Sequence, residues 1–259
     1  MKSPLNYLGG KSKLAQKIIA RIPTDHICYC EPFCGAGWVF FGKQPSRVEV
    51  INDLDKELVT FWRVVQNHLE EFLRFYKYAI VSRHIFDLEK RKDPAGLTDI
   101  QRACRYYYLQ RLSFAGKTVG RTFGTGTERP SNLNLSNVEE TLLDVHWRLE
   151  RVTIECLDAI ECIRRYDRPS TFFFVDPPYW HTAGYAVPFE EKDYLSLQAS
   201  LVGLNGKFLL TLNDTPEVRS IFKGFTVERV TLRYSAGNSR TAADTRTTDR
   251  HEVFIHNMS

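Results

Sequence analysis

The short run Asp176-Pro177-Pro178-Tyr179 places a carboxylate, a constrained backbone and an aromatic ring within four residues. Each proline fixes its φ angle and lacks an N–H, so the turn is stiff and cannot extend a sheet. The Asp176 carboxylate and the Pro177 carbonyl are two acceptors, and an NH2 group offers two donors. With the Tyr179 ring available for stacking, these residues favour a site for the amine of a nucleobase. A plain strand-ending turn is the alternative.

A buried strand must position this turn. Residues 171–175, Thr-Phe-Phe-Phe-Val, are rich in the aromatic and β-branched types that strands favour. Asp176 is therefore expected at the carboxyl end of a central strand, where open α/β sheets bind their ligands.

A second group of candidate residues lies nearer the N-terminus. Residues 27–33 are typical of a strand that runs into Gly35-Ala36-Gly37, and a further strand over 48–53 ends in Asn52-Asp53. Such glycines permit a tight turn with close backbone approach, and an acidic residue after the next strand can hold a ribose diol. The third glycine of the dinucleotide fingerprint is missing. The pattern therefore favours a nucleoside such as S-adenosylmethionine over NAD.

Gly9-Gly10-Lys11 precede a helix that the spacing of Leu14, Ile18 and Ile22 predicts. A glycine pair before a helix lets backbone N–H groups approach an anion, and Lys11 adds a positive charge. The spacing of a P-loop is absent. A flexible lead-in with a solvated lysine is an equally good interpretation of these residues alone.

Length and composition set wide bounds. The 259 residues are 43% hydrophobic and 25% charged with a net charge of +4, which suits an α/β core plus a smaller appended domain. No apolar run approaches the length of a membrane span, and no signal segment precedes the fold. We expect a cytoplasmic protein with reduced thiols, no membrane partner and no metal. Cys28, Cys30 and Cys34 lack zinc-site spacing and are expected to pack in a core.

Between Gln101 and Pro130 the chain becomes basic and rich in glycine and threonine. A basic, glycine-rich loop attracts a phosphate backbone, and an aromatic ring such as Phe114 can stack on a base or wedge between bases. A surface hairpin with merely solvated charges is the alternative. The stretch holds one acidic residue, Glu128, against six basic ones: Arg102, Arg105, Arg111, Lys117, Arg121 and Arg129.

The motifs Tyr7 to Lys11, Glu31 to Gly37, Asn52-Asp53 and Asp176 to Tyr179, in this order, resemble those of the DNA adenine methylase (Dam) family. The likeness spans most of the chain. It implies a Rossmann-like α/β sheet of the kind found in S-adenosylmethionine-dependent methyltransferases. The enzyme would methylate the N6 amine of an adenine flipped out of double-stranded DNA. Residues 1–55 and 151–259 would form the catalytic domain, and residues 56–150 an inserted, mainly helical target-recognition domain.

The resemblance also implies roles for single residues. The target base would be received by Asp176, Pro177, Pro178 and Tyr179. The cofactor would be held by loop, turn and strand-end residues: Tyr7, Gly9, Gly10, Lys11, Phe33, Gly35, Gly37, Asp53, Asp158 and Asp176. DNA would be contacted by Arg111, Phe114, Lys117 and Arg121. From its local sequence, however, Asp158 is better suited to cap the helix that follows it.

The implied mechanism depends on hydrogen-bond acceptors. The N6 nitrogen of adenine is a poor nucleophile because its lone pair is delocalised into the ring. Acceptors at Asp176 and at the Pro177 carbonyl would favour a pyramidal nitrogen, so positioning and electrostatics would supply most of the acceleration. Flipping the base out of the stack would cost a few kcal/mol.

Two departures from the family pattern limit the resemblance. Phe114-Ala115 stands where relatives carry a Tyr-Asn pair, so the GATC target of the family is not carried over, and Asp158-Ala159 replaces an Asp-Phe pair. A cytosine-N4 or other amino-methyltransferase, an NAD oxidoreductase and a non-catalytic DNA-binding relative stay open as alternatives. A cognate restriction endonuclease as partner and the oligomeric state are also left open.

Overall fold

The computed structural model describes residues 1–7, 11–124, 126, 130–182, 189–234 and 248–258. Within these residues the order of elements is α1 (Ala15–Ile19), β1 (Cys28–Glu31), α2 (Trp38–Gly42), β2 (Val48–Asn52), α3 (Lys56–Asn67), α4 (Leu69–Tyr76), α5 (Arg83–Arg91), η1 (Pro94–Gly96), α6 (Asp99–Leu112), η2 (Phe114–Gly116), η3 (Leu135–Asn137), α7 (Val138–Leu149), β3 (Thr153–Glu155), α8 (Ala159–Tyr166), β4 (Thr171–Val175), α9 (Glu191–Val202), β5 (Lys207–Asn213), α10 (Pro216–Ile221), β6 (Thr226–Tyr234) and β7 (Thr248–His256).

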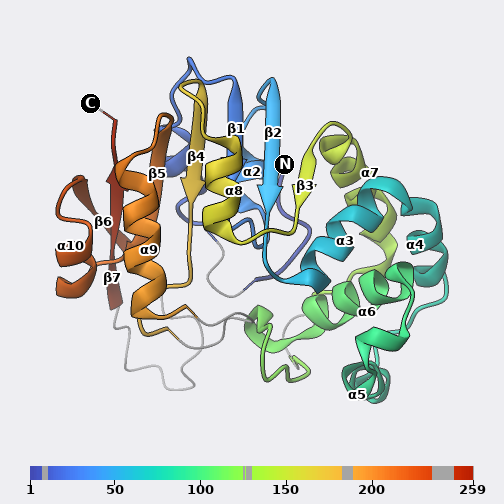
Figure 1. Ribbon diagram of the computed structural model, residues 1–259. Coiled ribbons are helices and arrows are strands. Elements are labelled where there is room, and N and C mark those ends of the chain that lie inside the picture. The colour runs from blue at the N-terminus through green and yellow to red at the C-terminus, as the bar shows by residue number, and fades with distance from the viewer. Residues whose placement is uncertain (8–10, 125, 127–129, 183–188, 235–247, 259) are drawn as a thin grey trace.

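The described strands form one seven-stranded sheet in the order β3-β2-β1-β4-β5-β7-β6. The strands from β3 to β5 are parallel, whereas β7 runs antiparallel to both β5 and β6. Strand addition reverses direction between β1 and β4, which are direct neighbours. In open α/β sheets such a switch point opens a crevice at the carboxyl ends of the strands. Figure 1 shows the carboxyl ends of β2 and β4 directed toward α6.

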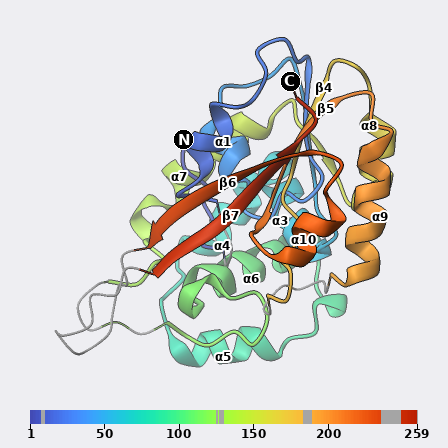
Figure 2. The same cartoon turned by 90° about the vertical axis from the view of Figure 1, so that its left-hand side faces the viewer.

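Helices cover both faces of this sheet, which explains why its central strands are continuous apolar runs. All five residues of β4 are buried, and its four apolar residues alternate between two hydrophobic clusters. Phe172 and Phe174 join the cluster on the side of α1 and α2, and Phe173 and Val175 join the cluster under α8 and α9. Figure 2 shows α1 and α9 on opposite sides of the strands. The next residue, Asp176, continues the alternation toward the side of α1.

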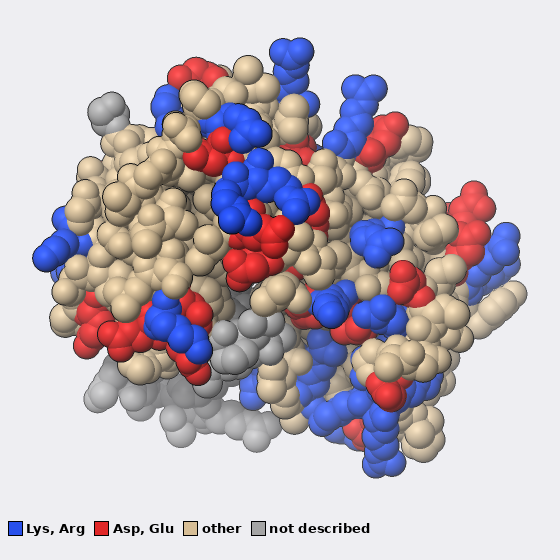
Figure 3. Space-filling view, in the orientation of Figure 1, with Lys and Arg blue, Asp and Glu red and all other residues tan. Residues whose placement is uncertain are grey.

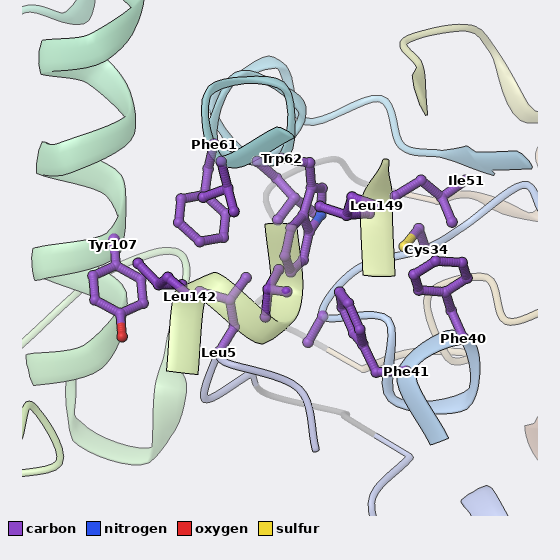
Figure 4. Packing of buried hydrophobic residues seen from close by; sticks show 14 of the residues in the cluster. Leu5, Cys34, Phe40, Phe41, Ile51, Phe61, Trp62, Tyr107, Leu142 and Leu149 are labelled. Carbon is purple, nitrogen blue, oxygen red and sulfur yellow. The ribbon is translucent and has the colours of Figure 1, made fainter. Parts of the chain in front are cut away.

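The helices from α3 to α7 share one buried cluster with the α1 side of the sheet. The ring of Phe61 on α3 stacks on Tyr107 of α6 with 5.5 Å between centroids, and Trp62 meets Phe41 of α2 at 5.4 Å. Figure 4 shows this packing running on to Leu5 and other side chains near the sheet. The helical segment and the sheet therefore have a continuous hydrophobic core.

A buried ion cluster adds a polar link between the same two parts. Arg148 of α7 binds the carboxylate of Glu49 on β2 at 2.5 Å, and Lys43 binds that carboxylate at 2.5 Å. The Arg148 guanidinium also lies 3.8 Å from the centroid of the Phe40 ring. Because removing one partner would leave buried charge behind, this cluster fixes α7 against β2.

Most elements predicted from the sequence are confirmed, and the exceptions have local causes. The apolar residues between 54 and 92 recur at the spacing of one helical stretch, but the structure divides this stretch into α3, α4 and α5, and His68 adopts φ −138° and ψ 39° between the first two. The short helices α2 and α10 were not predicted, since five or six residues are too few to show a periodic pattern. Cys30 and Cys34 pack in the two cores as expected.

Across the part of the chain that is described, no helix combines the length and apolar character that crossing a membrane requires.

Candidate active site

A cavity of about 280 Å³ opens at the carboxyl ends of β1, β2 and β4. It brings the two groups of candidate residues together, because the Gly35–Gly37 turn and Asp176 both line it. Pro177 and Tyr179 are not among its lining residues, and Gly9 and Gly10 lie outside the described residues. The candidate residues that do line it are Tyr7, Lys11, Phe33, Gly35, Gly37, Asp53, Asp158, Asp176 and Pro178.

Backbone conformation explains both glycines of the turn after β1. Gly35 has a φ angle of +50° and Gly37 one of +65°, in the left-handed region that side chains disfavour. A Cβ atom on Gly37 would also lie 3.0 Å from the Phe41 ring, and one on Gly35 would lie 3.5 Å from the Tyr7 ring. Gly37 therefore serves packing as well as the turn, while Tyr7 covers the turn.

Asp53, after β2, is tied to this turn. Its Oδ2 accepts the Gly35 N–H at 2.8 Å, and its Oδ1 accepts the Asp55 N–H at 3.0 Å. Burial raises the pKa of the Asp53 carboxyl to about 6, although these backbone donors oppose the shift. Each carboxylate oxygen has a second lone pair, so the group can still accept from a hydroxyl in the cavity.

The preceding residue, Asn52, joins three strand ends. Its amide donates to the Pro32 carbonyl at 2.8 Å and to the Leu157 carbonyl at 3.0 Å, and its oxygen accepts the Leu157 N–H at 2.8 Å. The side chain thereby holds the ends of β1 and β3 against β2. Asp158 follows Leu157 and caps α8 as its local sequence predicts, with Oδ1 accepting from the Ile160 N–H at 2.9 Å.

Among the described residues, two polar groups contact Asp176, and both meet the same oxygen. The Lys11 ammonium lies 2.6 Å from Oδ1, and the Thr211 hydroxyl donates to Oδ1 at 2.7 Å. Lys11 also lies 4.3 Å from the centroid of the Tyr179 ring, and only 7% of the residue is exposed. A desolvated ammonium over the face of an aromatic ring is attracted by the ring quadrupole, so Lys11 links the Asp176 carboxylate to the Tyr179 ring.

Side chains from other elements also anchor the turn that follows Asp176. The Tyr179 hydroxyl donates to the Glu252 carboxylate of β7, and the Tyr194 hydroxyl of α9 donates to the Pro178 carbonyl at 2.5 Å. The Asn213 side chain forms two hydrogen bonds with the Trp180 backbone. Its Oδ1 accepts from the Trp180 N–H at 3.0 Å, and its Nδ2 donates to the Trp180 carbonyl at 3.2 Å. Four of the five residues from Asp176 to Trp180 are thus held by contacts with other elements.

Glu31, at the end of β1, is a buried acid inside the same cavity. Only 1% of the residue is exposed, and one carboxyl oxygen accepts a hydrogen bond from the Tyr29 hydroxyl at 2.5 Å. Burial raises the pKa of Glu31 to about 8, and the negative charge of nearby Asp176 acts in the same direction. Glu31 is therefore mostly protonated at neutral pH, which limits the negative charge beside Asp176.

The hairpin from Ser113 to Phe123 lies next to the N-terminal segment that contains Asn6. A single antiparallel bridge joins these two residues, and the Phe114 side chain at its base is 58% exposed. Ala115 has a φ angle of 54°, a strained conformation for a residue with a Cβ. A Cβ on Gly116 would meet the Asn6 backbone at 2.9 Å. The hairpin is thus pressed against the segment that leads to Tyr7.

The predicted DNA-contacting arginines form internal contacts. Arg111 donates to the Pro4 carbonyl at 3.0 Å and to the Asn132 carbonyl. Arg121 donates to the Gln110 side chain at 3.1 Å, and its guanidinium lies 5.3 Å from the Tyr106 ring centroid. Arg121 therefore holds the hairpin against α6, whereas Arg111 joins α6 to the segments of Pro4 and Asn132.

Several residues of the site were given no role from the sequence. Thr211, Asn213 and Glu252 contact the turn after β4, and Glu31 lies in the cavity. A signal was present for Thr211, which interrupts the apolar run of β5 although it is fully buried. Nothing in the sequence indicates the partners of these side chains, because they come from strands distant along the chain.

Comparisons with known proteins agree with this geometry. A profile of the family described as D12 class N6 adenine-specific DNA methyltransferase matches residues 7–236. Type II methyltransferase M.CviBI of Paramecium bursaria Chlorella virus NC1A is 24% identical, with 87% of this chain and 88% of the relative covered. Type II methyltransferase M1.LlaDCHI of Lactococcus lactis subsp. cremoris is 23% identical, with coverage of 86% and 85%.

A DNA adenine methylase of Haemophilus influenzae is 22% identical, with 89% of this chain and 86% of the relative covered. The family match includes both motifs that line the cavity, the glycine turn after β1 and the Asp176 turn after β4. The chain belongs to the D12 class of N6 adenine-specific DNA methyltransferases.

Proposed function

We propose that Asp176, the Pro177 carbonyl and Tyr179 form the reaction centre that receives an adenine flipped out of double-stranded DNA. The observation that carries this proposal is the position of Asp176, which lines the same cavity as the Gly35–Gly37 turn. A base amine at Asp176 and a nucleoside cofactor at the glycine turn would then share one space. This arrangement is what transfer of a methyl group between them requires.

Enzymes of the D12 class use S-adenosylmethionine, and the chemistry of the cavity lining fits that cofactor. The side-chain-free turn at Gly35, the Asp53 carboxylate and the apolar Phe33 ring suit a ribose and a flat adenine. Lys11 supplies the positive charge that a carboxylate group of a ligand prefers, although it is paired with Asp176 in this structure. When bound, S-adenosylmethionine supplies an electrophilic methyl group on a sulfonium.

The protein's own groups would act on the target amine. The Asp176 carboxylate and the Pro177 carbonyl would each accept one N–H bond, which favours a pyramidal nitrogen with an available lone pair. Protonated Glu31 would leave Asp176 as the main negative charge at this end of the cavity. The Tyr179 ring, held by Glu252, would stack on the base and keep its amine directed toward Asp176.

We also propose that residues 56–150 form the target-recognition domain and that residues 1–55 and 151–259 form the catalytic domain. Basic side chains on the surface support a DNA contact: Figure 3 shows Lys and Arg gathered over the region of α5 and α6. Arg83, Lys90, Arg91 and Lys92, on and just after α5, are exposed. Contacts join this helix to the hairpin.

Two contacts make α5 and the hairpin one surface. The Arg83 guanidinium lies 4.9 Å from the Phe123 ring centroid, and Lys90 donates to the Arg121 carbonyl at 2.8 Å. Exposed Phe114 would supply the stack or wedge, and Lys117 a phosphate contact. Arg121 would act mainly by holding the hairpin, and Arg111 mainly by joining α6 to the segments of Pro4 and Asn132, with any DNA contact made by their remaining N–H groups.

The two relatives named Type II methyltransferases suggest restriction–modification. We therefore extend the proposal to a cognate restriction endonuclease that cuts the same DNA sequence. DNA treated with this protein and S-adenosylmethionine is expected to resist one such endonuclease, whereas untreated DNA is cut. Sequencing that reports modified bases would identify the site to be tested.

Replacing Asp176 tests the reaction centre. The Asp176→Ala variant is expected to bind DNA and S-adenosylmethionine within a few-fold of the wild type but to transfer methyl groups at least about a hundredfold more slowly, because a preorganised acceptor is lost. Transfer of labelled methyl to DNA gives the rate. Asp167→Ala is the matched control, because Asp167 binds the backbone of Gly206 at the opposite end of β4. Near-normal transfer by Asp176→Ala would refute the assigned role.

A further inference from the structure

The carboxyl end of β5 and the facing part of β7 carry polar side chains where a buried strand favours apolar ones. Thr211 lies between Leu210 and Leu212 and is 0% exposed, and Glu252 is 6% exposed. Because strand side chains alternate, Thr211 and Asn213 share one face of β5. Asn213 pairs directly with Glu252 across the antiparallel β5–β7 ladder, so all three side chains lie on the same side of the sheet.

Each of these three side chains contacts a different residue of the turn after β4. Thr211 donates to the Asp176 carboxylate at 2.7 Å. Glu252 accepts from the Tyr179 hydroxyl. Asn213 exchanges hydrogen bonds of 3.0 and 3.2 Å with the Trp180 backbone.

We propose that Thr211, Asn213 and Glu252 are positioning residues for methyl transfer, which hold the Asp176–Trp180 turn so that its carboxylate and ring face the target base. This set is called the β5–β7 clamp below. The inference rests on the roles proposed above for Asp176 and Tyr179 and extends them to residues outside the catalytic motif.

The proline pair explains why such a clamp is needed. Pro177 and Pro178 have no backbone N–H, so the turn cannot bind to the sheet through ladder hydrogen bonds at these positions. Side chains of the next strands supply the missing attachments. A buried hydroxyl, amide or carboxylate is unfavourable unless it is paired, and a valine would fill the place of Thr211 at no such cost. The clamp is therefore better explained by the turn that it holds than by the packing of β5.

The contacts on Asp176 show what Thr211 adds beyond Lys11. The last torsion of an aspartate side chain is only weakly restricted by its own geometry. Lys11 is a point charge on a flexible stem, and it can follow a carboxylate that rotates. The Thr211 hydroxyl comes from a fully buried position on a central strand, so it fixes the direction of Oδ1. Because the carboxylate group is planar, fixing the direction of Oδ1 also fixes the direction of Oδ2.

Replacing the Thr211 hydroxyl by a methyl group tests the clamp at the reacting carboxylate. Thr211→Val is expected to lower kcat for methyl transfer by about 10- to 100-fold, while KM for DNA and for S-adenosylmethionine changes by less than about threefold. Thr211→Ser retains the hydroxyl and is expected to restore kcat to within about threefold of the wild type. A thermal melt of each variant reports any general loss of stability.

Thr171→Val is the matched control. Thr171 is also a buried threonine on a central strand, and its hydroxyl donates to the Tyr166 carbonyl at 2.8 Å at the amino end of β4. It is expected to lower the melting temperature about as much as Thr211→Val does and to leave kcat unchanged. If Thr211→Val keeps the wild-type kcat, or if both variants lose activity equally, the positioning role of Thr211 is overturned.

A double-mutant cycle tests the other arm of the clamp. If Glu252 acts through the ring of Tyr179, then Tyr179→Phe and Glu252→Gln combined should be no slower than the slower single variant. Independent, multiplying losses would overturn the role of Glu252. Asp176→Ala is measured in the same assay. Retained transfer by Asp176→Ala overturns the proposed reaction centre itself, whereas its inactivity together with a normal Thr211→Val overturns only the clamp.

Discussion

The carboxyl edge of the sheet and the Ser113–Phe123 hairpin use their polar side chains in opposite ways. At the sheet edge, Asp53 and Asp176 line an open cavity and are held by donors behind them. In the hairpin, Arg121 bonds to the side-chain amide of Gln110, and on the adjoining helix α6 Arg111 bonds to the Pro4 carbonyl. The first region presents its polar groups to a cavity, whereas the contacts of the second maintain the shape of a loop.

This difference shows what each kind of motif reveals. A strand that ends in glycines or prolines fixes the backbone, and the backbone fixes where the next side chain lies. A basic loop shows only that positive charge is present. Whether its charges meet DNA or the protein depends on contacts between segments far apart in sequence.

At the carboxyl ends of the strands, the largest expected effect is a change of the free energy of unfolding with pH. Glu31 has a folded-state pKa of about 8 against an ordinary 4.5, so the folded protein binds the extra proton between these values. The bound proton adds about 3–5 kcal/mol to the free energy of unfolding. This stabilisation is fully present below about pH 4.5 and is lost as the pH rises through 8. Glu31→Gln, a neutral isostere, is expected to remove that fall in the free energy of unfolding, measured with urea at pH 5, 7 and 9.

Asp53→Asn is the comparison for Glu31→Gln. The Asp53 carboxyl has a folded-state pKa of about 6, so the stability that its protonation adds is lost between roughly pH 4 and 6. A slope above pH 7 that survives in Glu31→Gln, or disappears in Asp53→Asn, would show that the buried acid has been misassigned.

A pair of glycine substitutions measures how tightly the hairpin is held. Gly116→Ala would place a Cβ 2.9 Å from the Asn6 backbone at a φ of +66°, whereas Gly120→Ala, at a φ of +61°, has open space around it. We expect a loss of about 2–4 kcal/mol for Gly116→Ala and about 1 kcal/mol for Gly120→Ala, by chemical denaturation. Equal losses would indicate that the backbone angle alone matters and that the hairpin is not pressed on the N-terminal segment.

The smallest effect separates the two basic residues of the hairpin. Lys117→Ala is expected to lower the slope of log affinity for DNA against log salt by about one, with stability within about 0.5 kcal/mol of the wild type. Arg121→Ala, in contrast to Lys117→Ala, is expected to lower the free energy of unfolding by about 1–2 kcal/mol, because the hydrogen bond to Gln110 and the contact with Tyr106 are lost. The comparison fails if Arg121→Ala unfolds like the wild type, or if Lys117→Ala leaves the salt slope unchanged.

Sequence alone predicted the elements that carry the site. The strands before Gly35 and Asp176 were identified because both are apolar runs that end at glycine or proline. Their convergence on one cavity followed from the parallel sheet. Thr211 and Glu252 were missed because their partners lie in the turn after β4, and no local pattern encodes that contact. The split of the helical stretch at His68 was missed because the apolar spacing continues through it.

The hydrophobic core that runs from α3 and α6 into the α1 side of the sheet bears on how target specificity can be engineered. Exchanging residues 56–150 for the corresponding part of a relative would cut through that core, so Trp62 would lose Phe41 and Tyr107 would leave the rest of the cluster. A transplant that also carries the partners on α2 would fit better. Under the domain assignment proposed above, altering the hairpin alone, which contributes little to this core, is the more conservative route to a new recognition sequence.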